Sequence, residues 1–314
     1  MSRITQRLSA VAAPLTEQHI GLVQEYLQKT PRLLSAFHIS QVYMWQVRFG
    51  LWHAFINGRL CILFSQEQGC FMFLPPLGEA PDRTTVMSCF ELMDQVNEDA
   101  PLSRIENVPQ ETAQEWRAWG FDARERSPEY VYERRRLAAL PGNALKAKRA
   151  ALNQFQRRYA PEYRAYTPGD EPACQELLQL WSARRRDSRD DQLYRYLLED
   201  TSAAQELTLK SATRWGLTGR VLVAGDRIVG YTFGYPLNDQ IWCVLFETCD
   251  PSYNGSAAYL FREFCAQMKE YLWINCLDDS GLENVQRAKQ SYRPQTLLPV
   301  YAMAGGTAGP GENS

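Results

Sequence analysis

The chain has 314 residues, of which 45% are hydrophobic and 12% aromatic, and its formal net charge is −2 at pH 7. This length and composition allow one large core or two domain-sized cores. The charge balance argues against nucleic-acid or membrane binding by the chain as a whole, so any basic surface must be local.

The eight cysteines include no C-x-x-C pair, and several lie in apolar runs, so we expect reduced, mostly buried thiols in a cytoplasmic protein. His19, His38 and His53 are too few and too scattered for a histidine-based metal site. The N-terminus lacks the basic and then apolar order of a signal peptide. No apolar run reaches the ~20 residues that a membrane helix needs.

The first half predicts a helix, a three-stranded meander, and then helices alternating with strands. Thr16 is an N-cap candidate before apolar residues at helical spacing. Asn57-Gly58 separates two apolar runs and predicts a hairpin, because both turn residues tolerate positive φ. After a second turn at Gln68-Gly69 we expect a strand over 70–74, a helix over 84–97, a strand over 103–108, a helix over 110–119 and a strand over 129–134.

The second half repeats this order of elements after a basic amphipathic helix over 143–159. Glycine- and proline-containing turns divide residues 220–249 into three strands. The other expected elements are a strand over 162–168, helices over 171–186, 192–199 and a third up to 214, a helix over 256–271, a strand over 273–276, a helix over 280–290 and a strand over 296–303.

The shared order predicts an α/β protein of two units, each a mixed sheet with helices on its faces. We place an N-terminal domain at 1–136, a connector helix at 137–160, a C-terminal domain at 161–303 and a disordered glycine-rich tail at 304–314.

The stretch "CDPSYNGSAAYLFREF", residues 249–264, puts small residues between a strand and a helix. A meander followed by a small-residue loop and a helix is the layout of GNAT-superfamily acyltransferases, where free amides at the helix N-terminus hold a phosphate-bearing donor. The alternative is that the small residues only allow close packing of the helix, with Ser256 as an ordinary cap. The donor-binding candidates are Tyr253, Gly255, Ser256 and Ala257.

Several longer motifs occur in a defined order: "SQVYMWQVRFG", "FLPPLG", "LPGNALKAKRAALNQF", "GYTFGYPLND", "FETCDPSYNGSAAYLFREF" and "NCLDDSGLENVQRAKQSYRP". From about residue 15 to 303 the chain resembles the family of phosphatidylglycerol lysyltransferase C-terminal domains. The resemblance implies two GNAT-like domains in tandem. In the lipid-modifying members it implies transfer of an amino acid from aminoacyl-tRNA to a lipid head group. The membrane-spanning half of those enzymes is absent from this sequence. A small-molecule acceptor is therefore an alternative to the lipid head group.

The chain departs from the family pattern at several positions, so its activity or substrate can have drifted. Tyr235 stands where an acid is usual, and Thr248 where a lysine is usual. The other departures are Ala150 and Ala151 in the connector, 284–286 in place of Gly-Leu-Arg, and Ala257 and Phe261 on the helix after the small-residue loop.

Acyl transfer needs a held donor, a base and groups that stabilise the oxyanion. Glu247, near the end of a central strand, is the candidate base or amine-binding group; the alternative is a charge at a strand edge. Asp279 is a candidate ammonium ligand or, like Asp278, a helix cap. Tyr292 is a candidate proton donor to the leaving group, and Lys289 a candidate partner of a phosphate or of Asp279. The alternatives are packing for Tyr292 and helix-dipole compensation for Lys289.

The resemblance also carries over a set of substrate-binding candidates: Asn238, Asn275, Lys148, Arg149 and Asn153. Arg287, next to the departure at 284–286, is a further candidate. Basic residues of the connector and of "SARRRDSRDD" offer local surface for a tRNA, although such runs are commonly solvated helix faces.

The sequence therefore predicts an acyl- or aminoacyltransferase with its acceptor in the cleft between the two domains. The donor is aminoacyl-tRNA or, as second choice, acyl-CoA, with no resident cofactor firmly implied and no metal. Two other classes stay open: a catalytically inactive binding protein that keeps the scaffold, and a structural interaction module.

Overall fold

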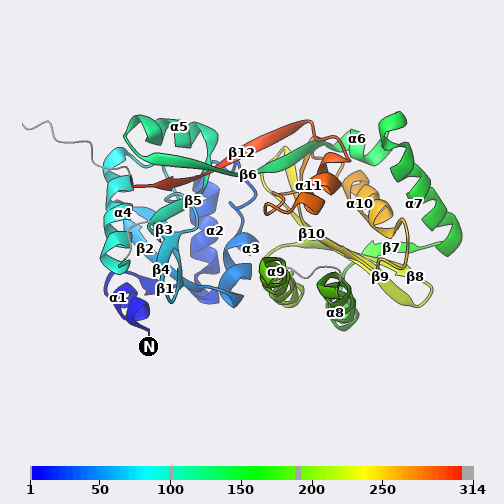
Figure 1. The fold of residues 1–314 in the computed structure, drawn as a ribbon, viewed down its shortest axis with the longest axis horizontal. Coiled ribbons are helices and arrows are strands. Elements are labelled where there is room, and N and C mark those ends of the chain that lie inside the picture. Colours follow the sequence, from blue (N-terminus) through cyan, green and yellow to red (C-terminus); the bar gives the residue numbers. More distant parts are fainter. Residues whose placement is uncertain (1, 99–101, 188–191, 306–314) are drawn as a thin grey trace, which may run out of the picture. The chain divides into compact units, whose positions relative to one another are not determined.

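The computed structural model describes residues 2–98, 102–187 and 192–305 (Figure 1). The chain forms two compact units, one of Met1–Pro128 with Leu298–Ser314 and one of Glu129–Leu297. From residue 306 onward, the tail expected to be disordered lies outside the described residues. The two units are taken in turn below.

The first unit is a mixed sheet with helices on both faces. β1 to β4 are antiparallel neighbours in chain order, β4 pairs parallel with β5, and the end of β12 pairs antiparallel with β5. Asn57 and Gly58 both have positive φ at the β2–β3 turn, as the hairpin signal predicts. The elements are α1 (Arg3–Val11), β1 (Ala13–Pro14), α2 (Ile20–Lys29), α3 (Ile39–Tyr43), β2 (Gly50–Ile56), β3 (Arg59–Gln66), β4 (Gly69–Met72), α4 (Arg83–Val96), β5 (Arg104–Pro109), α5 (Gln110–Ala118) and β12 (Thr296–Ala304).

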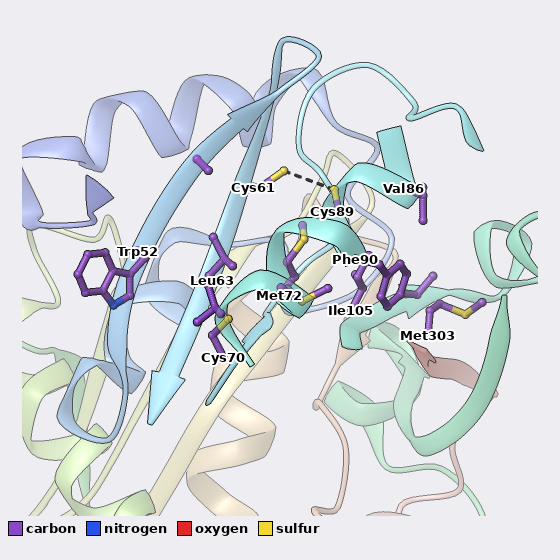
Figure 2. Packing of buried hydrophobic residues seen from close by; sticks show 14 of the residues in the cluster. Trp52, Cys61, Leu63, Cys70, Met72, Val86, Cys89, Phe90, Ile105 and Met303 are labelled. Carbon is purple, nitrogen blue, oxygen red and sulfur yellow. Dashed lines mark hydrogen bonds between the residues drawn. The ribbon is translucent and has the colours of Figure 1, made fainter. Parts of the chain in front are cut away.

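One face of this sheet is buried by α1, α4 and α5. Alternate residues of β2, β3 and β4, among them Trp52, Leu63 and Met72, point into the same cluster as Phe90 of α4. Figure 2 shows Met303 of β12 near Phe90 and Ile105, so the last strand of the chain completes this core.

The second unit is also a mixed sheet, in the order β6-β11-β10-β9-β8-β7. β11 pairs parallel with β10 and antiparallel with β6, and the remaining neighbours are antiparallel. The elements are β6 (Asp122–Glu133), α6 (Arg134–Ala139), α7 (Lys146–Tyr159), β7 (Glu162–Ala165), α8 (Glu171–Asp187), α9 (Gln192–Ser211), β8 (Thr218–Ala224), β9 (Arg227–Pro236), β10 (Ile241–Cys249), α10 (Ser256–Gln267), β11 (Trp273–Asn275) and α11 (Glu283–Gln290).

Both faces of the second sheet are covered. Val221 of β8 packs in one cluster with residues of α8 and α9, whereas its neighbour Leu222 packs in another with α7 and α10. This alternation is the two-residue period of a strand. Figure 1 shows α8 and α9 on one side of these strands and α10 on the other.

β6 and β12 each begin in one unit and end in the other. Val131–Glu133 of β6 pair with β11 in the second unit, and residues of β12 from Val300 onward pair with β5 in the first. The two units thereby exchange their sixth strands. The predicted domain limits remain predictions; the compact units differ from them, because α7 packs inside the second unit and the final strand belongs largely to the first.

The predicted α/β class and most predicted elements are confirmed. The helices expected over 192–199 and up to 214 form one helix, α9, which ends at Ser211. α10 ends at Gln267 rather than 271, and α11 begins at Glu283 rather than 280. α1, α3 and α6 were not predicted from the sequence. In the parts that the structure describes, no helix combines the length and hydropathy required to cross a bilayer.

Met303→Ala tests the contribution of the exchanged strand to the first core. The Met303 side chain is fully buried, so truncation should lower the free energy of unfolding by about 2–5 kcal/mol. Leu297→Ala, on the same strand but 43% exposed, should change it by no more than about 0.5 kcal/mol. Urea unfolding measures both, and equal effects would contradict the assignment of Met303 to this core.

Candidate active site

A wedge opens in the second sheet where two parallel strands separate. β10 and β11 pair over only three positions, Ile241–Cys243 with Trp273–Asn275. Beyond Asn275 the chain stays with β6, since the Cys276 amide donates to the Tyr130 carbonyl at 2.9 Å. β10 continues to Cys249 with a bulge between Val244 and Phe246. Its last residues therefore have no strand partner on the β11 side.

Glu247 lies in this stretch of β10. Its neighbour Thr248 donates a 2.8 Å hydrogen bond to Gln205 of α9, so by strand alternation Glu247 lies on the opposite face, which α10 covers. The Oε2 atom is buried and has no hydrogen-bond partner within the described residues. Burial raises the pKa of Glu247 to about 8, and the Lys148 ammonium opposes this rise. The carboxyl is thus poised to exchange a proton near neutral pH.

The charge of Glu247 acts on Lys148 and Tyr292, and the Tyr292 ring in turn contacts Phe261. Lys148 of α7 places its ammonium 4.4 Å from the centre of the Tyr292 ring. Burial lowers the pKa of Lys148, while the charge of Glu247 acts to raise it. Tyr292 follows α11, and its ring centre lies 4.9 Å from that of Phe261 on α10. Burial, followed by the charge of Glu247, raises the Tyr292 pKa, so this phenol remains a proton donor.

Three cysteines lie within range of the charge of Glu247. Glu247 contributes to the raised pKa of Cys249, Cys265 and Cys276, after the larger effect of burial in each case. Burial raises the pKa of Cys276 to about 12. The thiols therefore stay protonated and serve as apolar lining rather than as nucleophiles.

The small-residue loop allows close packing of α10 and also leaves free amides at the start of the helix, but the Ser256 amide is occupied. Gly255 has a φ of 90°, and a Cβ there would lie 2.8 Å from the carbonyl carbon of Ala151 on α7, so close packing requires glycine. The Ser256 amide is occupied by the Tyr253 carbonyl at 3.0 Å. The amides of Ala257 and Ala258 have no acceptor among the residues described, which leaves two free donors at the start of α10.

Ser256 is not the cap of α10. It is the first helical residue, its side chain is buried, and the cap position belongs to Gly255, which has no side chain to offer. Ser256 instead makes a side-chain hydrogen bond with Cys249. Tyr253 lies outside the helix, in contact with the ring of Tyr159.

Asp279, Lys289 and Asn275 stabilise the chain between β11 and α11. Asp279 accepts hydrogen bonds from Tyr130 at 2.6 Å and from the Gly281 amide at 2.9 Å, and it does not cap α11, whose cap position is Leu282. The Lys289 ammonium donates to the carbonyls of Cys276, Leu277 and Asp278. Asn275 donates to Glu129. These contacts account for the three residues structurally, and their substrate roles remain predictions.

The other substrate-binding candidates are not gathered at Glu247. Arg149 donates to the carbonyls of Leu140 and Gly142, and Arg287 forms an exposed pair with Glu283. Asn238 accepts from the amides of Gln240 and Ile241 in the β9–β10 turn, and Asn153 is exposed on α7. Of the predicted set, the structure brings together Glu247, Tyr292 and Lys148.

Sequence reasoning missed the residues that line the wedge beside these three. Phe261 stands out in the sequence only as a departure from the family pattern, and Cys276 only as one of eight cysteines. Their apolar neighbours give no local signal of a shared site, because α10, the segment after β11 and the segment after α11 converge only in the folded chain. No cluster of side chains suited to a metal ion occurs in the described part of the chain.

The buried carboxyl predicts a pH-dependent stability. Between about pH 5 and pH 8 an unfolded glutamate is ionised, whereas most folded Glu247 still carries its proton and only a minority is the carboxylate, so the free energy of unfolding should fall as pH rises. Glu247→Gln should remove at most about 1.4 kcal/mol per pH unit of this slope. Urea unfolding from pH 5 to pH 8 measures it, with exposed Glu270→Gln as control. Parallel profiles for wild type and Glu247→Gln would contradict the raised pKa.

Comparison with known proteins agrees with this architecture. A curated relative, an uncharacterised protein of Mycoplasmoides gallisepticum, is 26% identical over 179 residues, and the match spans 56% of each chain, about half of the relative's length. A conserved protein of unknown function from Bacteroides thetaiotaomicron is 24% identical with a TM-score of 0.82, covering 94% of this chain and 99% of that one.

The structure of L-PGS from Bacillus licheniformis shares the fold at 13% identity, with a TM-score of 0.64 over 94% of this chain and 93% of that one. The family model described as "Phosphatidylglycerol lysyltransferase, C-terminal" matches residues 29–304, which confirms the resemblance seen in the sequence. The chain therefore belongs to the family of phosphatidylglycerol lysyltransferase C-terminal domains.

Proposed function

We propose that this protein transfers an aminoacyl or acyl group to an amine or hydroxyl acceptor, with Glu247 as the general base. The observation that carries the proposal is the unpartnered Oε2 of Glu247 in the wedge between β10 and β11. A buried carboxyl with a pKa of about 8 is matched to proton transfer near neutral pH. Membership of a transferase family supports the same reaction class.

Glu247, Lys148 and Tyr292 have different roles in the proposed reaction. The acceptor N–H or O–H gives its proton to the Glu247 carboxylate as the nitrogen or oxygen attacks the carbonyl carbon of the donor. The Lys148 ammonium, which acts on both Glu247 and the Tyr292 ring, is the group that would stabilise the resulting oxyanion. When the intermediate collapses, the bond to the leaving group breaks and Tyr292 supplies a proton to that group. The proton that Glu247 took from the acceptor then passes through solvent to the Tyr292 phenolate, which restores both residues.

The donor we favour is aminoacyl-tRNA, with acyl-CoA as the alternative. Both carry phosphates, and the two free amides at the start of α10 suit an anion. The acceptor is a lipid head group or a small molecule that presents an amine or hydroxyl. Proposed partners are accordingly a tRNA and this acceptor, and the proposed location is the cytoplasm.

The direct test is incubation of the purified protein with radiolabelled aminoacyl-tRNA pools or acetyl-CoA, with phosphatidylglycerol vesicles and a panel of small amines as acceptors. We expect accelerated loss of the acyl group from one donor. Glu247→Gln should slow this by about 10²–10⁴-fold, whereas Glu270→Gln should have no effect. A wild-type protein that turns over neither donor would contradict the proposal and favour the inactive binding protein.

Tyr292→Phe distinguishes the two donors. A ribose hydroxyl leaves as a strongly basic alkoxide and needs a proton, so loss of the phenol should reduce aminoacyl-tRNA turnover by about 10²-fold or more. A thiol has a pKa of about 8.5 when unperturbed and leaves readily as thiolate, so acetyl-CoA turnover should hardly change.

The measurement is kcat for each donor with the wild type and the Tyr292→Phe variant. Phe261→Leu, next to Tyr292, controls for altered packing of the ring. An unchanged rate with aminoacyl-tRNA would contradict the role of Tyr292 as an acid.

A further inference from the structure

A groove that includes Tyr253, a donor-binding candidate, and Arg184, from the basic run "SARRRDSRDD", lies beside the loop leading into α10. It has a volume of about 470 Å³ and is lined by Tyr159, Arg184, Arg227, Asp250, Ser252 and Tyr253. These residues come from α7, α8, the start of β9 and the loop after β10. Four separate segments of the second unit therefore form one concave surface.

Arg184 is held in place at one side of the groove. Its Nη1 donates to Asp250 at 3.1 Å and to Ser252 at 2.9 Å. Asp250 is itself buried and accepts from the amide and hydroxyl of Ser252. The Nη2 and Nε groups of Arg184 make no hydrogen bond to the described residues, so a positioned guanidinium keeps donors for a ligand.

Arg227 supplies a second positive charge. It is exposed at the start of β9 and forms no ion pair within the portion of the chain described. Arg184, Arg227 and Asp250 together give the groove a net charge of +1. Two guanidinium groups on one concave surface favour phosphate, whose oxygens accept paired N–H donors.

Two tyrosine rings form the other side. The ring centres of Tyr159 and Tyr253 lie 4.9 Å apart at 51°, and the Arg158 guanidinium lies 5.1 Å from the Tyr159 ring centre. Aromatic rings beside arginines are the usual surface for stacking a nucleic-acid base while its phosphates are neutralised. Phosphate-binding and base-stacking groups thus occur in the same groove.

The groove is also close enough to the wedge to serve the same donor. Tyr253 lies six residues after Glu247, which limits their Cα separation to about 22 Å. The same loop continues directly into Ser256, where α10 begins.

We propose that this groove binds the adenosine nucleotide of the acyl donor, with its base against Tyr159 and Tyr253 and its phosphate on Arg184 and Arg227. The inference rests on the proposed transferase function. Adenosine nucleotide chemistry is shared by the 3′ end of a tRNA and by coenzyme A, and the experiment below separates these two sources.

The test is binding of two probes, a short RNA ending in CCA and coenzyme A, by fluorescence anisotropy or calorimetry over a range of salt concentrations. Arg184→Met and Arg227→Met, which keep the alkyl stem, should each weaken the binding of the true probe by about 10-fold or more. Each should also reduce the slope of log K against log salt by about 1. Arg136→Met, an exposed arginine of α6, is the matched control and should change neither.

If only the RNA binds in an arginine-dependent way, the donor is an aminoacyl-tRNA. If only coenzyme A does so, the donor is an acyl thioester. If neither probe binds, or if both arginine variants bind the probe as tightly as the wild type, the groove is not a nucleotide site. If both arginine variants turn over the donor with the wild-type KM, the nucleotide site is likewise rejected, whereas the proposed transfer reaction is supported. If a probe binds in an arginine-dependent way but the protein turns over no donor, the nucleotide site is supported and the proposed transfer reaction is rejected.

Discussion

The short parallel pairing between β10 and β11 is the constraint on which the candidate site depends. A ladder continued past Cys243 would place a strand alongside Glu247. Instead β11 ends after three pairs and the following residues remain with β6. Near this part of β10 the Tyr292 ring contacts Lys148 of α7 and Phe261 of α10. These three residues come from three different segments of the chain. A break in backbone pairing thereby becomes a place where side chains from distant segments meet.

The wedge concentrates charge and apolar surface at the same point. Glu247 carries an unpaired buried oxygen, which is unfavourable for stability unless it has a use. The protonated thiols and aromatic rings around it keep the local dielectric low, which strengthens the interaction with Lys148. Lys289, by contrast, is fully engaged with backbone carbonyls and holds the turn that carries Asp279. The two lysines nearest the wedge thus have different tasks.

Two departures from the family pattern have structural explanations. Thr248 and Tyr231 both donate to Gln205 of α9, so the position where a lysine is usual is part of a buried polar contact. Tyr235 is fully buried on β9, opposite Cys243 of β10. Neither side chain reaches the Glu247 face, so a substrate group that an acid or lysine there would bind must be recognised elsewhere.

The sequence predicted what depends on local pattern. The Asn57-Gly58 hairpin, the alternating strands and the helices α4, α5, α7 and α8 follow from periodicity and turn chemistry, and Glu247 and Tyr292 were found through family resemblance. The strand exchange could not be predicted, because β6 and β12 have the same apolar pattern whichever neighbour they pair with. The groove at Arg184 could not be predicted as a unit. Tyr253 and the basic run that contains Arg184 were candidates separately, but the members of the groove are separated by up to 94 positions and local sequence does not show that they meet.

The path of the final strand also has a bearing on biosynthesis. Met1–Pro128 is synthesised before the second unit, yet the strand that flanks β5 is synthesised only after that unit. Until then the edge of β5 is an open ladder that can recruit other strands. The first unit is consequently completed only after the second has been synthesised, so Glu129–Leu297 can fold before β12 pairs with β5.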